Sequence, residues 1–323
     1  MHKLTITLSA LAFAAASGSA FAQTYPDRPV TIVVPFSAGG PTDTVARLVS
    51  EVMSRELGQQ VLVQNVGGAG GTLGAGQVAE AGADGYTLLI HHIGMSTAPT
   101  LYRNLPYDPL TDFTPVGLIT AVPMTLIAKK DFEPTTLQEL VDYVKANGDQ
   151  VTYGNAGIGA ASHLCGMLLM EAIGTQMTTV PYQGTGPMMT DLLGGQIDMS
   201  CDQTTNTTSQ ILAGEVKAYA VTVPERLDNL PDLPTTKEAG LDLEVSVWHG
   251  LYGPAGMPED VVTKLQSALQ AALADETVAA RFAELGTTPV TAEEATPAAL
   301  TETLTSQIAV WKPVIEAAGT YAD

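Results

Sequence analysis

One turn combines small residues with the residue types that start helices: Ser37-Ala38-Gly39-Gly40-Pro41-Thr42-Asp43. The first N–H groups of a helix have no partner inside the helix, and the positive end of the helix dipole lies there. Because Gly39 and Gly40 carry no side chain, a ligand can approach this backbone closely. The turn is therefore a candidate site for a carboxylate. The alternative is a plain tight turn between a strand and a helix.

Other residues suited to chemistry occur in patterns that do not favour catalysis. Ser162-His163 and His91-His92 contain nucleophile, base and metal-ligand types. The sequence has no G-x-S-x-G turn, and a loose nucleotide pattern at residues 74–79 lies inside a predicted helix. We therefore expect no enzyme, no metal and no cofactor. Ser162 is expected to cap a helix that begins at His163, with its hydroxyl free for a ligand oxygen.

Alternating strands and helices must position the first turn. Residues 30–36 are a β-branched run typical of a buried strand, and the turn and a helix follow it. A second strand at 61–66 leads into glycines and a small-residue helix, and a third strand covers 86–91. This order predicts parallel strands, whose ligands lie beyond the carboxyl ends. The third such end, residues 92–96, adds Gly94 to the candidate site.

The alternation of strands and helices then begins again at residue 124. Further strands are predicted at 124–128, 151–154, 178–182, 197–201 and 216–221, with helices between the first four, and they form a second sheet. Asn155 and Ser162 lie in the turn after 151–154. Asp202 follows 197–201 and is expected to face a cleft between two lobes. There it would orient water, accept a ligand N–H or hydroxyl, or cap a helix.

Three predicted helices after Trp248 need a partner surface: 258–274, 277–285 and 297–318. The first lobe offers that surface. We therefore predict lobe 1 as residues 23–122 plus 249–323, and lobe 2 as residues 123–248.

The first 22 residues predict a cleavable signal peptide. A basic start is followed by an apolar run at 4–16 and by Ala20-Phe21-Ala22. The run is too short for a stable membrane span, and a retained anchor helix is the alternative. Because no Cys stands at the cleavage point, we expect no lipid anchor. The mature chain is expected in the periplasm.

The charge balance restricts the partners. The chain has 14 Lys and Arg against 34 Asp and Glu, so nucleic acid is a poor partner. Local fields must hold any anion, because no basic residue lies between Phe36 and Thr44. Arg47 is four residues after Asp43 on one helix, and we expect these two to pair. This structural role is preferred for Asp43 over ligand contact.

Cys165 and Cys201 are the two cysteines of the sequence. In an exported chain, where disulfides persist, they suggest one bridge. The alternative is two buried free thiols. Zinc is not expected, since no C-x-x-C or H-x-x-x-H spacing accompanies them.

Segments along nearly the whole mature chain resemble the extracytoplasmic receptors of tripartite tricarboxylate transporters, the Bug receptors. They are YPDRP at 25–29, PFSAGGPTDTVAR at 35–47, DGYTL at 84–88, SHL at 162–164, PYQG at 181–184, DLLGGQID at 191–198 and AGEVKA at 213–218. The resemblance implies an α/β, two-lobed periplasmic binding protein fold. Each lobe would be a mainly parallel sheet flanked by helices, with the ligand cleft between the lobes.

By position, the ligand loops that the resemblance implies are residues 37–43 and 182–187. The predicted ligand-binding residues are Ser37, Ala38, Gly39, Gly40, Thr42, Asp43, Gly94, Asn155, Ser162, His163, Tyr182, Gly184, Thr185 and Asp202. The expected ligand is a small organic carboxylate: a di- or tricarboxylate, an aromatic acid or an acidic amino acid. The expected protein is a monomer that delivers it to membrane permease subunits. Alternatives are a ligand sensor for a signalling receptor and an exported hydrolase.

Overall fold

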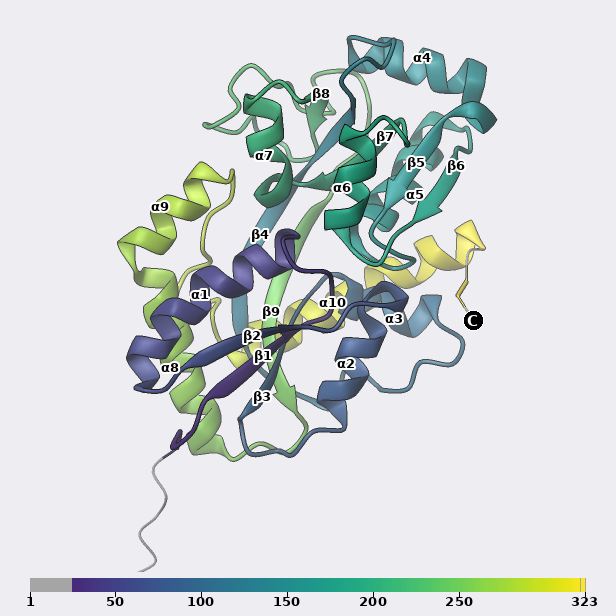
Figure 1. Ribbon diagram of the computed structural model, residues 1–323. Helices are drawn as coiled ribbons and strands as arrows, with labels where there is room; N and C mark the ends of the chain where they lie inside the picture. The colour runs from purple at the N-terminus through teal and green to yellow at the C-terminus, as the bar shows by residue number, and fades with distance from the viewer. Residues whose placement is uncertain (1–24, 320, 323) are drawn as a thin grey trace, which may run out of the picture.

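The computed structural model describes residues 25–319, 321 and 322, and the predicted signal peptide lies outside them. Lobe 1 occupies the lower half of Figure 1 and contains three parallel strands: β1 (Val30–Val34), β2 (Val61–Asn65) and β3 (Thr87–His92). They alternate with α1 (Pro41–Leu57), the 3-10 helix η1 (Ala69–Gly71) and α2 (Thr72–Ala79), and α3 (Gly94–Leu101) follows β3. Four of the five β1 residues are buried, as its Val and Ile run predicts.

Lobe 2 occupies the upper half of Figure 1 and repeats this design. Its parallel strands are β5 (Thr152–Asn155), β6 (Thr178–Pro181) and β7 (Met199–Gln203), and β8 (Val216–Val221) lies beyond them in the chain. Its helices are α4 (Leu137–Asn147), η2 (Gly148–Gln150), α5 (Ala161–Ile173), α6 (Thr185–Leu193) and α7 (Thr204–Leu212). Thr136 and Glu139 form a capping box that starts α4.

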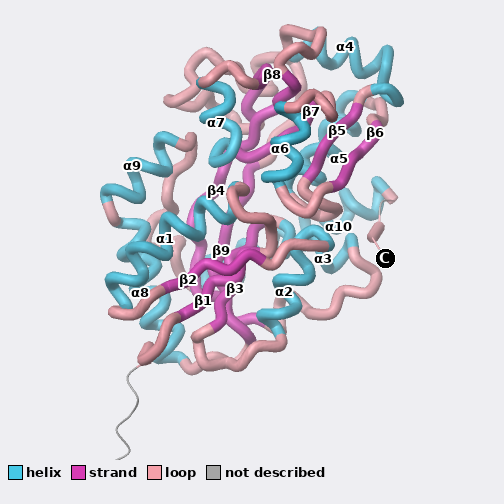
Figure 2. The backbone as a smooth tube through the Cα atoms, viewed as in Figure 1, coloured by secondary structure: helices cyan, strands magenta, loops and turns pink. Residues whose placement is uncertain are grey.

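Two long antiparallel strands join the lobes: β4 (Phe113–Lys129) and β9 (Ser246–Pro254). From Phe113 to Pro123, β4 pairs with β9, and from Met124 onward it pairs with β7 and β8. The separate strand predicted at 124–128 is thus the second half of β4. The sheet runs β2-β1-β3-β9-β4-β7-β5-β6, with β8 also on β4. Figure 2 shows both strands passing through the waist of the molecule.

The three helices predicted after Trp248 are present as α8 (Glu259–Ala274), α9 (Glu276–Glu284) and α10 (Pro297–Ala318). Leu265 and Leu269 of α8 share a buried cluster with Val45 and Val49 of α1. α10 packs on α3 and β4. Each buried aliphatic side chain of this kind contributes about 1.5–3 kcal/mol. Within the ranges that the structure describes, no helix is long and apolar enough to cross a bilayer.

The predicted bridge between Cys165 and Cys201 is confirmed, and it joins α5 to β7 inside lobe 2. Tyr153 reinforces the same junction. Its hydroxyl donates to the carbonyl oxygen of Ser162 at 2.6 Å and accepts from the N–H of Cys201 at 3.1 Å. The bridge and the tyrosine therefore fix the start of α5 against the end of β7.

Replacing both cysteines by alanine is expected to lower the free energy of unfolding by about 3–4 kcal/mol. The half-cystines are 36 residues apart, and closing a loop of this length restricts the unfolded chain by about that amount. Urea unfolding of wild type and variant, followed by circular dichroism, measures the difference. Equal midpoints would contradict the expectation, as would two titratable thiols in the unfolded, unreduced wild type.

Candidate functional site

A small pocket with a volume of about 10 Å³, room for about one water molecule, lies where the two lobes meet. Its lining residues are Phe36, Pro41, Thr42 and His92 from lobe 1, and Ala156, Ala160, Ala161, Ser162, Thr185, Asp202 and Gln203 from lobe 2. Lys and Arg are both missing from this lining. Because both lobes supply walls, the pocket is complete only when they are together.

The start of α1 forms the lobe 1 wall. Gly40 is the N-cap, with an extended backbone (φ −84°), and Pro41 follows at the first helical position, where a missing N–H costs nothing. The Thr42 hydroxyl oxygen lies 3.3 Å from Nε2 of His249, whose Nδ1 lies 3.2 Å from the Val247 carbonyl oxygen. Since a carbonyl only accepts, Nδ1 carries the ring proton and Nε2 accepts from Thr42. The Thr42 oxygen is thereby left as an acceptor.

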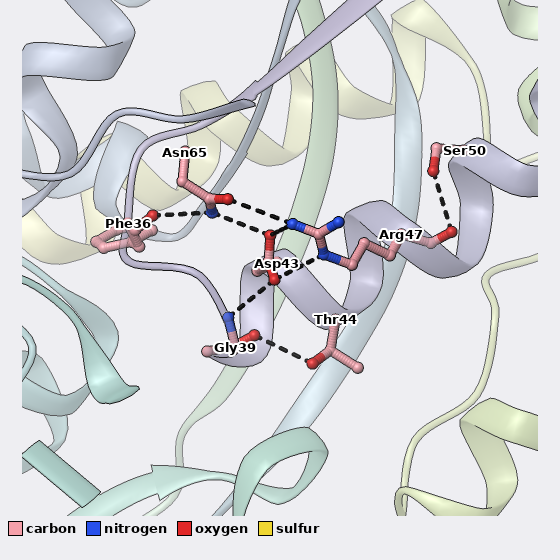
Figure 3. A network of polar contacts seen from close by, with 8 residues as sticks. Phe36, Gly39, Asp43, Thr44, Arg47, Ser50 and Asn65 are labelled. Carbon is pink, nitrogen blue, oxygen red and sulfur yellow. Dashed lines mark hydrogen bonds and ion pairs between the residues drawn. The ribbon is translucent and has the colours of Figure 1, made fainter. Parts of the chain in front are cut away.

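Asp43 holds this turn rather than lining the pocket (Figure 3). Its Oδ2 accepts from the N–H of Gly39 and from Nε of Arg47, both at 2.9 Å. Its Oδ1 accepts from Nη2 of Arg47 at 3.0 Å and from Nδ2 of Asn65 at 2.9 Å. The predicted pair with Arg47 is present. Although burial opposes it, this set of hydrogen bonds lowers the pKa of Asp43, so its carboxylate fixes the turn that begins α1.

Three buried histidines back the lobe 1 wall. Burial lowers the pKa of His91 to about 3 and of His249 to about 4, and it holds the pKa of His92 well below its usual value. All three are therefore neutral at pH 7. Nδ1 of His92 accepts from the N–H of Gly94 at 2.9 Å, which places the ring proton on Nε2. His92 thus brings an uncharged donor to the pocket lining.

The start of α5 forms part of the lobe 2 wall. The helix begins at Ala161 with Ala160 as its N-cap, so the predicted capping role of Ser162 is wrong. Ala160 takes the extended cap conformation directly after a turn in which Gly157 and Gly159 have positive φ. The helix therefore starts two residues earlier than the sequence predicted. Ser162 instead lines the pocket, and its Oγ accepts from the N–H of Ala156 at 2.8 Å.

The start of α6 meets the lobe 1 turn directly. Gly184 is its N-cap, and a Cβ there would lie 2.2 Å from Oγ of Ser37. Thr185 follows and lines the pocket. Tyr182 stays out of the lining, since its hydroxyl donates to Oδ2 of Asp191 at 2.7 Å and ties the loop to α6.

Asp202 and Gln203 close lobe 2's side of the pocket at the end of β7, where α7 begins. Both side chains are almost fully buried, with 1% and 3% exposed. Burial raises the pKa of Asp202 to about 7, although the side chain of Asn206, the N–H of Gln203 and the hydroxyl of Thr185 favour its charged form. Gln203 is the N-cap of α7 and makes no capping bond with its side chain. The sequence showed Gln203 only as part of a hydroxyl- and amide-rich stretch, residues 202–208, and without defined bounds for α7 it did not select this side chain as a ligand residue.

Four helices begin at the pocket: α1, α5, α6 and α7. Each helix start presents unpaired N–H groups and a positive partial charge of about one half. Together they supply about two positive charges without any cationic side chain. Helix starts of this kind bind carboxylate groups once the lobes separate enough to admit a ligand, and the hydroxyl of Ser162, whose oxygen accepts from Ala156, can donate one further polar contact.

Some predicted ligand residues lie elsewhere. Gly94 donates its N–H to His92, and Oδ1 of Asn155 accepts from the N–H of Gly157 at 3.0 Å. His163 lines a different cavity, between α5 and α10. Ala38 and Gly39 are exposed and do not line the pocket. Several lining residues were not among the predicted ligand-binding residues. Pro41 lies within the predicted ligand loop 37–43 and His92 within the strand end 92–96, whereas Phe36, Ala156, Ala160, Ala161 and Gln203 lie outside both segments. No group of three His, Cys, Asp or Glu that could hold a metal occurs in the described ranges.

Glycine backbones bring the lobes together beside the pocket. The Tyr102 hydroxyl of lobe 1 donates to the carbonyl oxygen of Ile158 in lobe 2 at 2.6 Å. Next to it, a Cβ on Gly70 would lie 1.8 Å from the same oxygen. Only a residue without a side chain fits there.

Comparison with known proteins gives consistent matches. The profile described as tripartite tricarboxylate transporter family receptor matches residues 45–320. A UPF0065 protein in the TAR-I ttuE-ttuC' intergenic region of Agrobacterium vitis is 57% identical over 91% of this chain and 86% of its own length.

Solved structures agree in fold. The periplasmic binding protein BugD is 53% identical and covers 93% of this chain and all of its own, with a TM-score of 0.90. MatC from Rhodopseudomonas palustris with bound malate is 42% identical over 90% of this chain and all of its own, with a TM-score of 0.88. A further R. palustris protein, with adipate, is 34% identical over 92% and 99%, with a TM-score of 0.87. The predicted two-lobed fold is confirmed.

Proposed function

The chain belongs to the tripartite tricarboxylate transporter receptor family, and we propose that it binds a small organic carboxylate between its lobes. It would act in the periplasm after cleavage of residues 1–22, as a monomer, and deliver the ligand to membrane permease subunits. We propose residues 23–122 plus 249–323, and 123–248, as the two lobes that close on the ligand. In this proposal the protein catalyses no reaction, because the pocket's role is to hold an anion.

The observation that carries the proposal is the convergence of four helix starts on a pocket lined without Lys or Arg. Dipole ends contribute about 0.3–2 kcal/mol each, depending on burial. Hydrogen bonds to a charged group contribute about 1.5–3 kcal/mol each. Four or five such bonds are enough for micromolar binding after the costs of association. The bound malate of MatC and the adipate of its R. palustris neighbour belong to the same ligand class.

A thermal-shift screen of carboxylates on the mature protein tests the proposal. The panel contains dicarboxylates, tricarboxylates, aromatic acids and acidic amino acids, with neutral sugars and basic amino acids as controls. A carboxylate at one hundred times its Kd adds about 2.7 kcal/mol of stability. We expect such a shift for at least one acid and for no control. A panel in which no carboxylate stabilises the protein, whether or not a control compound does, would overturn the proposal.

Gly40→Pro should weaken carboxylate binding about ten- to a hundredfold, because it removes one backbone donor at the start of α1. The φ of −84° at Gly40 suits proline. Gly40→Ala is the matched control, since it keeps the N–H and its Cβ would meet nothing closer than 3.5 Å. Isothermal titration calorimetry compares the three proteins. Equal Kd values for Gly40→Pro and Gly40→Ala would show that this N–H does not bind the ligand.

A further inference from the structure

Lobe 2's side of the pocket holds oxygen atoms that only accept when Asp202 is ionised, above its pKa of about 7, and that a bare carboxylate cannot then use. Oε1 of Gln203 is buried and has no hydrogen-bond partner among the described residues. The Asp202 carboxylate beside it receives a short hydrogen bond from Nδ2 of Asn206, 2.8 Å from Oδ2. Its Oδ1 receives a long one from the Thr185 hydroxyl, at 3.4 Å, and the N–H of Gln203 also interacts with the carboxylate. Both residues line the pocket, so their oxygens are left for a ligand that can donate.

Lobe 1 adds a third acceptor on the opposite wall. The proton of the Thr42 hydroxyl is directed at Nε2 of His249, so the Thr42 oxygen can accept but not donate. Like Asp202 and Gln203, Thr42 is almost fully buried, with 2% exposed. Carboxylate oxygens are acceptors only. A ligand built of carboxylates alone would therefore leave Oε1 of Gln203 without a donor and would add none to the oxygens of Asp202 and Thr42, which costs binding free energy.

We propose that Asp202 and Gln203 are specificity-determining residues, which select carboxylates that also carry a hydrogen-bond donor, a hydroxyl or an ammonium group. This inference rests on the proposed function, because the helix starts must first hold the carboxylates. In the bound state, the donor group gives its hydrogen to Asp202 and Gln203, while the helix N–H groups bind the acid groups. A buried site of this kind rejects the analogue that lacks the donor, since its own polar atoms then stay unpaired.

Two matched acid series test the inference by titration calorimetry: succinate, malate and aspartate, and glutarate, 2-hydroxyglutarate and glutamate. Within each series the skeleton is constant, and one carbon carries hydrogen, hydroxyl or ammonium. We expect one substituted acid to bind at least about tenfold tighter than its parent, the factor for a single hydrogen bond to a charged group. Tighter binding of the hydroxy acid would identify the ligand's donor as a hydroxyl, and tighter binding of the amino acid would identify it as an ammonium group.

Asp202→Asn is the decisive variant, since it keeps the shape and leaves an acceptor for Asn206 but turns an N–H₂ group toward the ligand. We expect the preference to shrink to less than about threefold, mainly through weaker binding of the substituted acid. Asp198→Asn is the matched control. Asp198 lies in the same lobe, bound to Lys129 at 2.6 Å and to Thr152, and does not line the pocket. It should leave the preference unchanged.

Three results would overturn the inference while leaving the proposed function intact. The parent acid could bind as tightly as its derivatives, Asp202→Asn could retain the wild-type preference, or none of the six acids could bind although another carboxylate of the wider panel does. The proposed function itself fails by a different result, in which no carboxylate stabilises the protein.

Discussion

Lowering the pH from 7 to 5 is expected to reduce the free energy of unfolding by about 5–6 kcal/mol. His91, His92, His163 and His249 are buried, and burial lowers the pKa of each. In the unfolded chain they titrate near 6.5. Between pH 6.5 and the folded values, unfolding therefore takes up protons, and stability is lost as the pH falls. Each histidine contributes about 2 kcal/mol at pH 5, at 1.36 kcal/mol per unit of pKa.

Asp202 changes the free energy of unfolding in the opposite direction as the pH falls. Its pKa is raised to about 7 by burial, so the folded protein binds its proton before the unfolded chain does. This contributes stability below pH 7 and offsets about 2 kcal/mol of the loss at pH 5. Asp202→Asn should therefore be more sensitive to acid than wild type by about that amount.

Urea unfolding of the ligand-free protein at pH 5, 6, 7 and 8 measures both effects. The lowered pKa values of Asp43 and Asp198 start from 3.8, so those carboxylates lose their contribution below this pH range. A free energy of unfolding that is the same at pH 5 and pH 7 would mean that the histidines titrate normally in the folded state. That result would contradict the claim that His91, His92 and His249 are buried and neutral behind the lobe 1 wall of the pocket.

Gly70→Ala is expected to weaken ligand binding at least about a hundredfold by keeping the lobes apart. The new Cβ would lie 1.8 Å from the carbonyl oxygen of Ile158, and backbone cannot yield as a flexible side chain can. Gly70 does not line the pocket, so the loss would arise from closure alone. Calorimetric titration of the best carboxylate gives the Kd.

The variant Gly58→Ala is the control that distinguishes an effect on lobe closure from an effect of backbone strain. Gly58 has φ +67° and Gly70 has φ +60°, so alanine is strained at both, by about 1–2 kcal/mol. A Cβ on Gly58 would meet nothing within 4 Å. Both variants should therefore lose similar stability without ligand, while only Gly70→Ala loses affinity. Wild-type affinity in Gly70→Ala would show that the liganded protein does not need this contact.

The sequence predicted the lobes because their strands and helices have strong local patterns. Residues 30–36 are a β-branched run, and the helices after Trp248 show apolar residues at helical spacing. Asp43 and Arg47 could be paired from their spacing alone. The bridge between Cys165 and Cys201 followed from cysteine number and export. Each of these inferences needed only information close together in the chain or a simple count.

Features that depend on tertiary structure could not be predicted in this way. Helix α7 begins Thr204-Thr205-Asn206-Thr207-Thr208, and threonine and asparagine are weak helix formers. Four of these five residues are buried, so packing overrides the weak propensity. The position of the α5 cap depends on positive φ values at Gly157 and Gly159. Similarly, the acceptor role of the Thr42 oxygen depends on His249, which lies 207 residues away in the chain.

A crystal structure of the mature protein with its tightest-binding carboxylate tests the central claim most directly. The account predicts the ligand between the lobes, with acid oxygens within hydrogen-bond distance of backbone N–H groups at the starts of α1, α5 or α6. It also predicts contacts from the hydroxyls of Ser162 or Thr185, and no cationic side chain on the ligand. An Arg or Lys side chain paired directly with the ligand carboxylate would contradict the account, and so would a ligand bound outside this pocket.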